Sequence, residues 1–274
     1  MVIFLYSNKE YENQVKSCIR SLTHKMTKDL KIVYYTIGFK SDFEFPNLYK
    51  VEYPVKPEYK RFHFYKAELS LVTMDMFPDE HYAFTDTDVL FSRRFDPDKV
   101  KHSLTYPMGS YGPHEFPYIW ERSGDGVTTI YDEKKMMEYF NVPERSQRYL
   151  WSCFYSFNPQ CRDFFEEYTS MCSNQYLQNQ QKEYFPYADE TAFNICLWKR
   201  NATQNLGFAF VNTHLFSTVK AVEESTVSNT RMGNTVDAFG MDWEYVQDPE
   251  KILLYHGFKE DSDMLPTLDY LLNI

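Results

Sequence analysis

The sequence predicts an α/β fold in which a mostly parallel central sheet is flanked by helices. Over residues 2–88, short apolar runs suited to buried strands alternate with segments whose apolar residues recur at helical spacing. The chain of 274 residues shows no internal repeat and no low-complexity linker. We therefore expect a single domain over residues 1–274, with a loop-rich second half.

The first half, residues 1–100, is expected to alternate strands and helices. Apolar or β-branched runs predict strands at 2–6, 30–38 and 47–55, and the run His81–Asp88 closes the unit. Helical spacing indicates two helices, one carried by Val15, Cys18, Ile19 and Leu22, and one by Tyr65, Leu69, Val72 and Met76.

The second half, residues 101–274, has weaker patterns. Residues 105–148 are rich in Gly, Pro and aromatic residues without a clear period, and are expected to form a loop. Asn158 and Pro159 suit a helix N-cap and first helical position. Apolar or strand-like runs lie at 151–159, 207–216 and 251–255. Helices are expected over Cys161–Cys172, after Glu190 with Ala192, Ile195 and Cys196 facing inward, and over Leu268–Leu272.

Composition and charge exclude several classes of protein. A formal net charge of −10 argues against duplex nucleic acid and anionic membrane surfaces as partners. No stretch approaches the roughly 18 apolar residues that a membrane helix needs, and the first residues lack the basic segment of a signal peptide. Five scattered cysteines without a CxxC motif indicate buried thiols in a reducing compartment, so we expect a cytoplasmic protein.

Two carboxylates close the predicted strand at residues 81–88. In an extended segment, residues two apart point the same way, so Asp86 and Asp88 can present oxygens to one point. Their repulsion, a few kcal/mol at an effective dielectric of about 20, is relieved if a hard divalent cation lies between them. The alternative is a turn in which the aspartates cap backbone groups.

The context of this pair resembles a known family. The segment YKRFHFYKAELSLVTMDMFPDEHYAFTDTD, residues 59–88, places an arginine and a helix before the strand and its D-x-D. It resembles the nucleotide-sugar glycosyltransferases with a GT-A fold, especially family 8. Three further stretches are similar to family motifs in the same order: WSCFYSFNP at 151–159, ADETAFNICLW at 188–198 and YHGFK at 255–259.

The resemblance implies a Rossmann-like GT-A domain with a nucleotide-binding half, residues 1–100, and an acceptor and catalytic half, residues 101–274. It implies metal-dependent transfer of a sugar from a nucleoside diphosphate sugar to a hydroxyl of a saccharide or other acceptor, with retention of configuration. Asp86, Asp88 and His256 would be the metal ligands. Two carboxylates, an imidazole and phosphate oxygens suit Mn²⁺, with Mg²⁺ as the alternative.

The resemblance also implies residues that bind the donor, which are Tyr6, Ser7, Asn8, Arg61, Asp86, Thr87, Asp88, Asn158, Gly257 and Lys259. Tyr6 could stack on the base or simply end a strand, and Lys259 could neutralise phosphate or face solvent. Asn158 could contact the sugar or cap its helix. Lys66 could be a surface residue. Trp151 could stack on the acceptor or pack in the core, and Tyr111, His114 and Trp120 are further acceptor-side candidates.

Asp189 and Glu190 are the expected catalytic acids. In an inverting enzyme, one of them would be the general base on the acceptor hydroxyl; in a retaining enzyme, they would position the donor sugar. Asp189 could also merely cap its helix.

Two rival functions remain. Haloacid-dehalogenase-type phosphatases also use D-x-D after an apolar strand, but normally with Gly-Thr soon after, where this chain has Val-Leu-Phe. A non-catalytic carbohydrate-binding scaffold is the second alternative.

Overall fold

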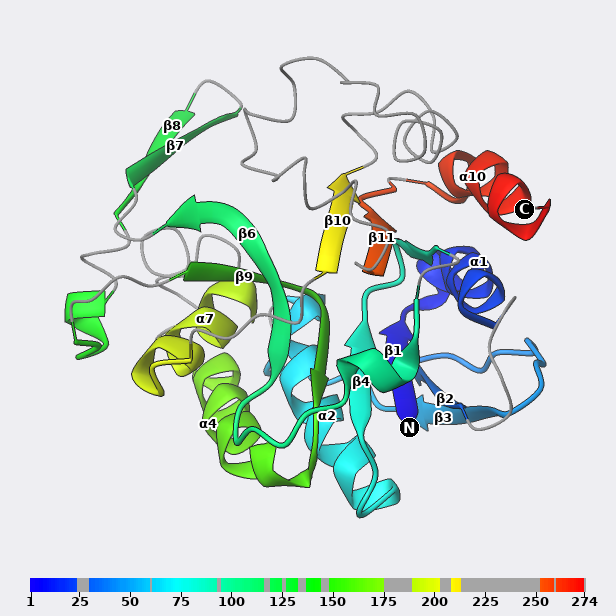
Figure 1. Ribbon diagram of the computed structural model, residues 1–274, viewed down its shortest axis with the longest axis horizontal. Helices are drawn as coiled ribbons and strands as arrows, with labels where there is room; N and C mark the ends of the chain where they lie inside the picture. Colours follow the sequence, from blue (N-terminus) through cyan, green and yellow to red (C-terminus); the bar gives the residue numbers. More distant parts are fainter. Residues whose placement is uncertain are drawn as a thin grey trace.

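The predicted α/β architecture with a central sheet is confirmed by a computed structural model (Figure 1). Six strands form the main sheet in the order β3-β2-β1-β4-β9-β6. The structure describes residues 1–23, 30–59, 61–92, 95–115, 119–124, 127–132, 137–143, 148–174, 189–202, 208–212, 252–258 and 260–273.

The parallel part of this sheet consists of four strands. They are β1 (Val2–Ser7), β2 (Lys31–Ile37), β3 (Leu48–Tyr53) and β4 (Tyr82–Thr85). β1 lies between β2 and β4, and β2 pairs with β3, all in parallel register. Because helices cover both faces, β1 and β2 read as nearly continuous apolar runs rather than as alternating ones.

Two layers of helices cover the two faces. α1 (Glu12–Thr23) packs through Val15 and Ile19 against Ile3 and Leu5 of β1. The neighbouring residues of β1 point to the other face, where α2 (Tyr65–Met76), α4 (Arg162–Ser173) and α7 (Asp189–Lys199) pack. α10 (Asp261–Asn273) lies against α1 (Figure 1). Within the described residues, no helix combines the length and the apolar character needed to cross a membrane.

Short 3₁₀ turns connect several elements: η1 (Lys9–Tyr11), η2 (Phe62–Phe64), η3 (Pro97–Val100) and η4 (Pro159–Cys161). η4 leads into α4, and the side chain of Asn158 accepts a hydrogen bond from the Gln160 backbone N–H at 2.8 Å. The predicted cap is therefore confirmed.

The prediction that residues 105–148 form a loop is wrong in part. This segment contains β6 (Met108–Glu115) and the hairpin β7 (Ile119–Gly124) and β8 (Val127–Asp132). β6 pairs antiparallel with β9 (Arg148–Phe157), with shifts of register along the pair. Gly109 lies so close to β9 that a Cβ there would be 3.2 Å from the Phe154 carbonyl oxygen. Glycine and irregular register obscure the alternation that marks a strand.

A second, smaller sheet brings the end of the chain to the acidic pair. β11 (Ile252–His256) pairs in parallel with β10 (Phe208–Asn212) and antiparallel with β5 (Val89–Phe91). In this register His256 lies opposite Val89, the residue that follows Asp88. The topology thus joins two segments that are far apart in sequence.

Candidate active site

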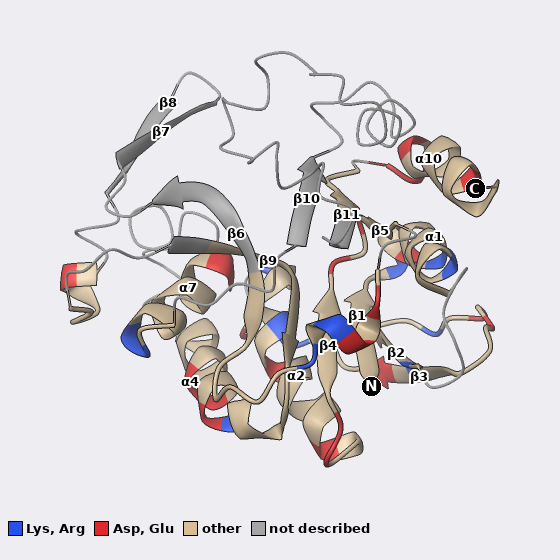
Figure 2. Cartoon of the chain, viewed as in Figure 1, with Lys and Arg blue, Asp and Glu red and all other residues tan. Residues whose placement is uncertain are grey.

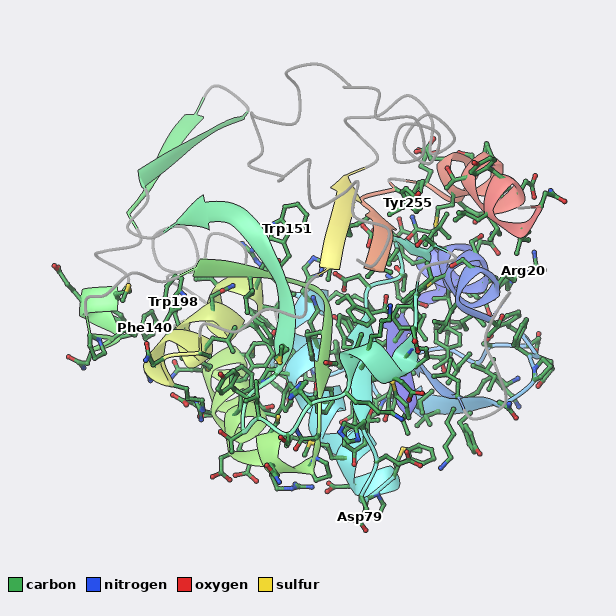
Figure 3. All side chains as sticks on the ribbon, in the orientation of Figure 1. Arg20, Asp79, Phe140, Trp151, Trp198 and Tyr255 are labelled. Atoms are coloured by element: carbon green, nitrogen blue, oxygen red, sulfur yellow. The ribbon has the colours of Figure 1, made fainter. Side chains whose placement is uncertain are left out.

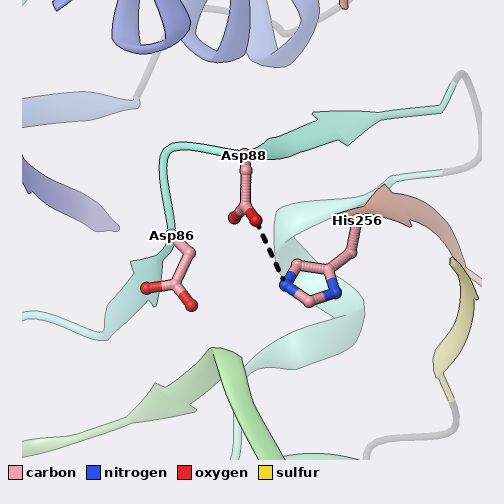
Figure 4. A group of neighbouring side chains, drawn as sticks. All are labelled: Asp86, Asp88 and His256. Carbon is pink, nitrogen blue, oxygen red and sulfur yellow. Dashed lines mark ion pairs between the residues drawn. The ribbon is translucent and has the colours of Figure 1, made fainter. Parts of the chain in front are cut away.

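Asp86, Asp88 and His256 form a compact group of possible metal ligands (Figure 4). Asp86 follows β4, Asp88 precedes β5 and His256 ends β11. One ligand atom from each residue lies within 4.8 Å of the others. The Nε2 atom of His256 is 3.5 Å from Oδ2 of Asp88. The pairing of β5 with β11 therefore assembles the donor set that the resemblance implied.

Backbone hydrogen bonds fix the segments that carry these side chains. The Asp86 N–H donates to the Cys153 carbonyl at 2.8 Å, and the Gly257 N–H donates to the Asp88 carbonyl at 3.2 Å. Gly257 has a φ of 93°, a conformation that is strained for residues with a Cβ. The glycine after His256 thus lets the chain turn immediately beyond the strand.

Asp86 is partly buried among charged side chains. Burial raises its pKa to about 6; the Lys66 ammonium opposes this rise, whereas the Asp88 carboxylate adds to it. The two aspartates thus repel each other when both are ionised. A divalent ion bound between them would remove this penalty.

Lys66 is buried beside Asp86 and Asp189, which rules out the possibility that it is only a surface residue. Its ammonium lies 2.8 Å from Asp189, 3.3 Å from Asp86 and 3.1 Å from the Ser152 carbonyl oxygen. Burial works to lower the pKa of Lys66, but the carboxylates of Asp189 and Asp86 hold it well above its usual value. Sequence reasoning missed Lys66 because its two partners lie 20 or more positions away along the chain.

Asp189 and Glu190 begin α7 and face β9 at the same place. The Ser152 hydroxyl donates to Asp189 at 3.3 Å, and the Ser152 backbone N–H donates to Glu190 at 2.9 Å. Asp189 is 5% exposed. Lys66 and Ser152 therefore connect the expected catalytic acids with the metal-ligand group, although the acids and Asp86 come from different halves of the chain.

The end of β1 contributes less directly than expected. The Tyr6 hydroxyl donates to the His63 carbonyl at 3.1 Å, and its ring packs against Phe62 and Phe84. Burial raises the pKa of Tyr6 well above its usual value. A ring enclosed in this way is not presented for stacking on a base, so the alternative of a plain strand end fits Tyr6.

Ser7 and Asn8 also have structural partners. The Ser7 hydroxyl lies 2.6 Å from the Tyr34 hydroxyl, and the Asn8 side chain accepts a bond from the Tyr11 N–H at 3.4 Å as the cap of η1. Ser7 is the last residue of β1 and Asn8 follows it, so both lie at the carboxyl end of a sheet strand, where ligands of α/β sheets bind.

The remaining residues predicted to bind the donor do not all lie at the site. The Thr87 hydroxyl donates to the side-chain oxygen of Gln14 at 3.4 Å, and Arg61 directly precedes η2. Asn158 is not brought to the site, because β9 runs antiparallel to β4 and ends beside Tyr82, the first residue of β4. Its amide instead donates to the carbonyls of His102 and Leu104. Lys259 lies outside the described residues.

Trp151 adds an aromatic wall to the site. Its ring centroid lies 6.2 Å from that of His256, at an interplanar angle of 44°, and the side chain is labelled in Figure 3. It is partly buried and packs against the hydrophobic cores on both faces of the sheet. The other acceptor-side candidates, Tyr111, His114 and Trp120, have backbones in β6 and β7, and their side chains are outside the described part of the structure.

Comparisons with known proteins agree with this architecture at the level of fold. No family model and no curated protein sequence matches the chain. Among solved structures, the galactosyltransferase LgtC in complex with donor and acceptor sugar analogues superposes with a TM-score of 0.57 at 12% identity, covering 100% of this chain and 95% of LgtC. An active-site mutant of LgtC gives a TM-score of 0.55 at 11% identity, over 98% of this chain and 96% of that one.

The bifunctional glycosyltransferase WbbM gives a TM-score of 0.59 at 14% identity, over 98% of this chain and 49% of WbbM. At these identities the likeness establishes the fold. The chain has the GT-A fold that these glycosyltransferases share.

Proposed function

We propose that this protein is a metal-dependent glycosyltransferase that moves a sugar from a nucleoside diphosphate sugar to a hydroxyl group of a saccharide or other acceptor. The observation that carries the proposal is the group Asp86, Asp88 and His256, held on a GT-A fold beside the buried acid Asp189. Residues 1–100 would bind the nucleotide, and residues 101–274 would supply the acceptor side.

The donor set fits a divalent cation of the Mn²⁺ or Mg²⁺ type. Two carboxylates and one imidazole within 4.8 Å offer hard oxygen ligands and one nitrogen, which favours Mn²⁺, with Mg²⁺ as the alternative. A cation held there would act as a Lewis acid on the diphosphate that departs from the sugar. Lys259, two positions after Gly257 in the sequence, is our candidate for a further positive charge on that phosphate.

Asp189 and Glu190 are proposed to orient the sugar that is transferred. Lys66 and Ser152 fix the Asp189 carboxylate from two sides, so it meets the sugar in one orientation. A fixed, ion-paired carboxylate is better suited to hold sugar hydroxyls than to abstract a proton. We therefore favour retention of configuration, which NMR of the anomeric proton in the product would test directly.

The closing experiment is a screen of nucleotide sugars by isothermal titration calorimetry, with Mn²⁺ and with EDTA, followed by a transfer assay on the sugars that bind. We expect Mn²⁺-dependent binding of at least one nucleotide sugar. Cleavage of a generic phosphoester with Mg²⁺, without nucleotide-sugar binding, would instead support the phosphatase alternative. Carbohydrate binding that is independent of metal and nucleotide would support the scaffold alternative.

We also propose that the protein acts in the cytoplasm and does not bind duplex nucleic acid. All five cysteines are buried and none forms a disulfide with another, which suits a reducing compartment. Figure 2 marks acidic residues on α4 and α10 and basic residues on α1, so the described part of the chain carries charges of both signs. Cell fractionation and a DNA-binding assay at low salt would test the two statements.

A further inference from the structure

One face of α1 carries buried polar side chains where a purely apolar face would be expected. Gln14, Ser17, Cys18 and Ser21 follow the spacing of successive helical turns, and all four are buried. Burial of a polar side chain is costly unless it is hydrogen-bonded, so the partners of this face indicate what it does.

Gln14 touches both segments that supply the proposed metal ligands. Its side-chain oxygen accepts a hydrogen bond from the hydroxyl of Thr87, the residue between Asp86 and Asp88. Its side-chain nitrogen donates to the carbonyl of Phe258, two residues beyond His256, at 3.3 Å. A single amide of α1 therefore spans the acidic turn, residues 86–88, and the turn that follows β11.

Of the other members of this face, only Cys18 reaches one of these two segments, whereas Ser17 and Ser21 bind neighbouring elements. The Ser17 hydroxyl donates to Asp261, the first residue of α10, at 3.1 Å. Cys18 Sγ lies 3.8 Å from the Asp86 carbonyl oxygen. The Ser21 hydroxyl accepts the backbone N–H of Phe91, at the far end of β5, at 3.0 Å. Gln14 is distinguished from these residues because it contacts both segments at once.

Strand pairing holds the two segments that carry the metal ligands together only where β5 and β11 are hydrogen-bonded. The β5–β11 ladder ends at the pair Val89 and His256, and one further bond joins the Gly257 N–H to the Asp88 carbonyl. Thr87 and Phe258 lie beyond that ladder, where the Gln14 amide joins them. A metal site requires ligand distances defined to about 0.2 Å, so a tie at this point has a direct effect on affinity.

We propose that Gln14 is a positioning residue that sets the spacing between the acidic turn and His256. The inference rests on the proposed function, because it assumes that these side chains bind a divalent ion. It assigns to α1 a role in metal affinity that is separate from its packing against β1.

The test is Gln14→Met. Methionine matches glutamine in side-chain length and in helix propensity, but it cannot form either hydrogen bond. Titration with Mn²⁺ alone, by calorimetry and by electron paramagnetic resonance of free Mn²⁺, should give an affinity lower on the order of tenfold. Asn13→Ala removes an exposed amide from the same helix and should bind Mn²⁺ like the wild type. Thr87→Val, which breaks only one of the two bonds, should give a smaller loss.

Ser21→Ala separates positioning from general stability, because it breaks a buried hydrogen bond of α1 at the far end of β5. We expect it to lower the melting temperature but leave Mn²⁺ affinity unchanged. Wild-type affinity in both Gln14→Met and Thr87→Val would overturn the inference. So would a loss of affinity that follows the loss of melting temperature equally in Gln14→Met and Ser21→Ala. If the wild type itself does not bind Mn²⁺, the proposed metal site fails first, and this inference fails with it.

Discussion

Asp88 illustrates how a single side chain can favour function over stability. In the metal-free protein, its charge adds to the raised pKa of Asp86, so the pair repels. With a cation bound, the same two charges would become ligands. The two effects have opposite signs, and a single substitution can reveal both of them.

For Asp88→Asn we expect Mn²⁺ affinity to fall by about a hundredfold or more, since a direct ligand is lost. The melting temperature of the metal-free protein should rise or stay the same, because one of two repelling charges is removed. Calorimetric titration and thermal unfolding in EDTA measure the two quantities. A clear drop in metal-free stability would show instead that Asp88 is a structural cap.

Removal of Lys66 should cost stability, because it would leave the buried carboxylate of Asp189 and the partly buried one of Asp86 without their cation. For Lys66→Met we expect a loss of about 3–5 kcal/mol in unfolding free energy, measured by urea denaturation. The double variant Lys66→Met, Asp189→Asn should recover part of that loss, since one of the uncompensated charges is then gone. Additive effects in the two single variants would contradict the direct pairing seen at 2.8 Å.

At the level of elements, Glu68 of α2 fastens the helix to the end of β3. It accepts hydrogen bonds from the hydroxyls of Tyr53 at 2.6 Å and Tyr59 at 2.8 Å, and it forms an ion pair with Lys56. Burial works to raise the pKa of Glu68, but the Lys56 ammonium and the two tyrosine hydroxyls outweigh it and hold the pKa below its usual value. The ionised form is therefore the one that stabilises the fold.

The sign of the pH dependence follows from this depressed pKa. The stabilisation is present above the unfolded-state pKa of about 4.3 and is lost as the pH falls through the folded-state value. Glu68→Gln should lower the unfolding free energy by about 1–3 kcal/mol at pH 7, and this difference should shrink below about pH 4. Urea denaturation at both pH values checks it. A difference that grows in acid would reverse the assignment.

Elements differed in how far the sequence could predict them. β1, β2 and α1 were predictable, because buried strands and a one-sided helix impose strong local patterns. β6 was not, since Gly109 makes its close approach to β9 possible and also erases the alternation of a strand. The pattern of β6 depends on a partner strand about 40 residues later, which a local reading cannot contain.

The site shows the same division. The acidic turn could be found from its two-residue spacing, and His256 from its motif, but Lys66 acquires its role only through contacts with Asp86 and Asp189. Asn158 had two readings, and only the pairing of β9 with β4 places it at the opposite end from Asp86. The role of a residue whose partners are distant in sequence can therefore be assigned only from the folded structure and not from a local motif.

For the whole molecule, metal binding should appear as added stability, because the ligands come from two sheets that must both be folded. A ligand that binds only the native state at about 100 times its dissociation constant adds about 2.7 kcal/mol to the unfolding free energy. We expect saturating Mn²⁺ to raise the melting temperature and EDTA to reverse this. An equal rise in Asp88→Asn would place the responsible ion elsewhere.

The pairing of β11 with β5 also has a consequence for biosynthesis. The six strands of the main sheet all lie before residue 158, whereas His256 comes much later. A nascent chain can therefore assemble its main sheet on the ribosome well before the imidazole leaves the exit tunnel. Synthesis would therefore complete the proposed metal site after the main sheet, so a product that stops before residue 256 should lack its imidazole ligand.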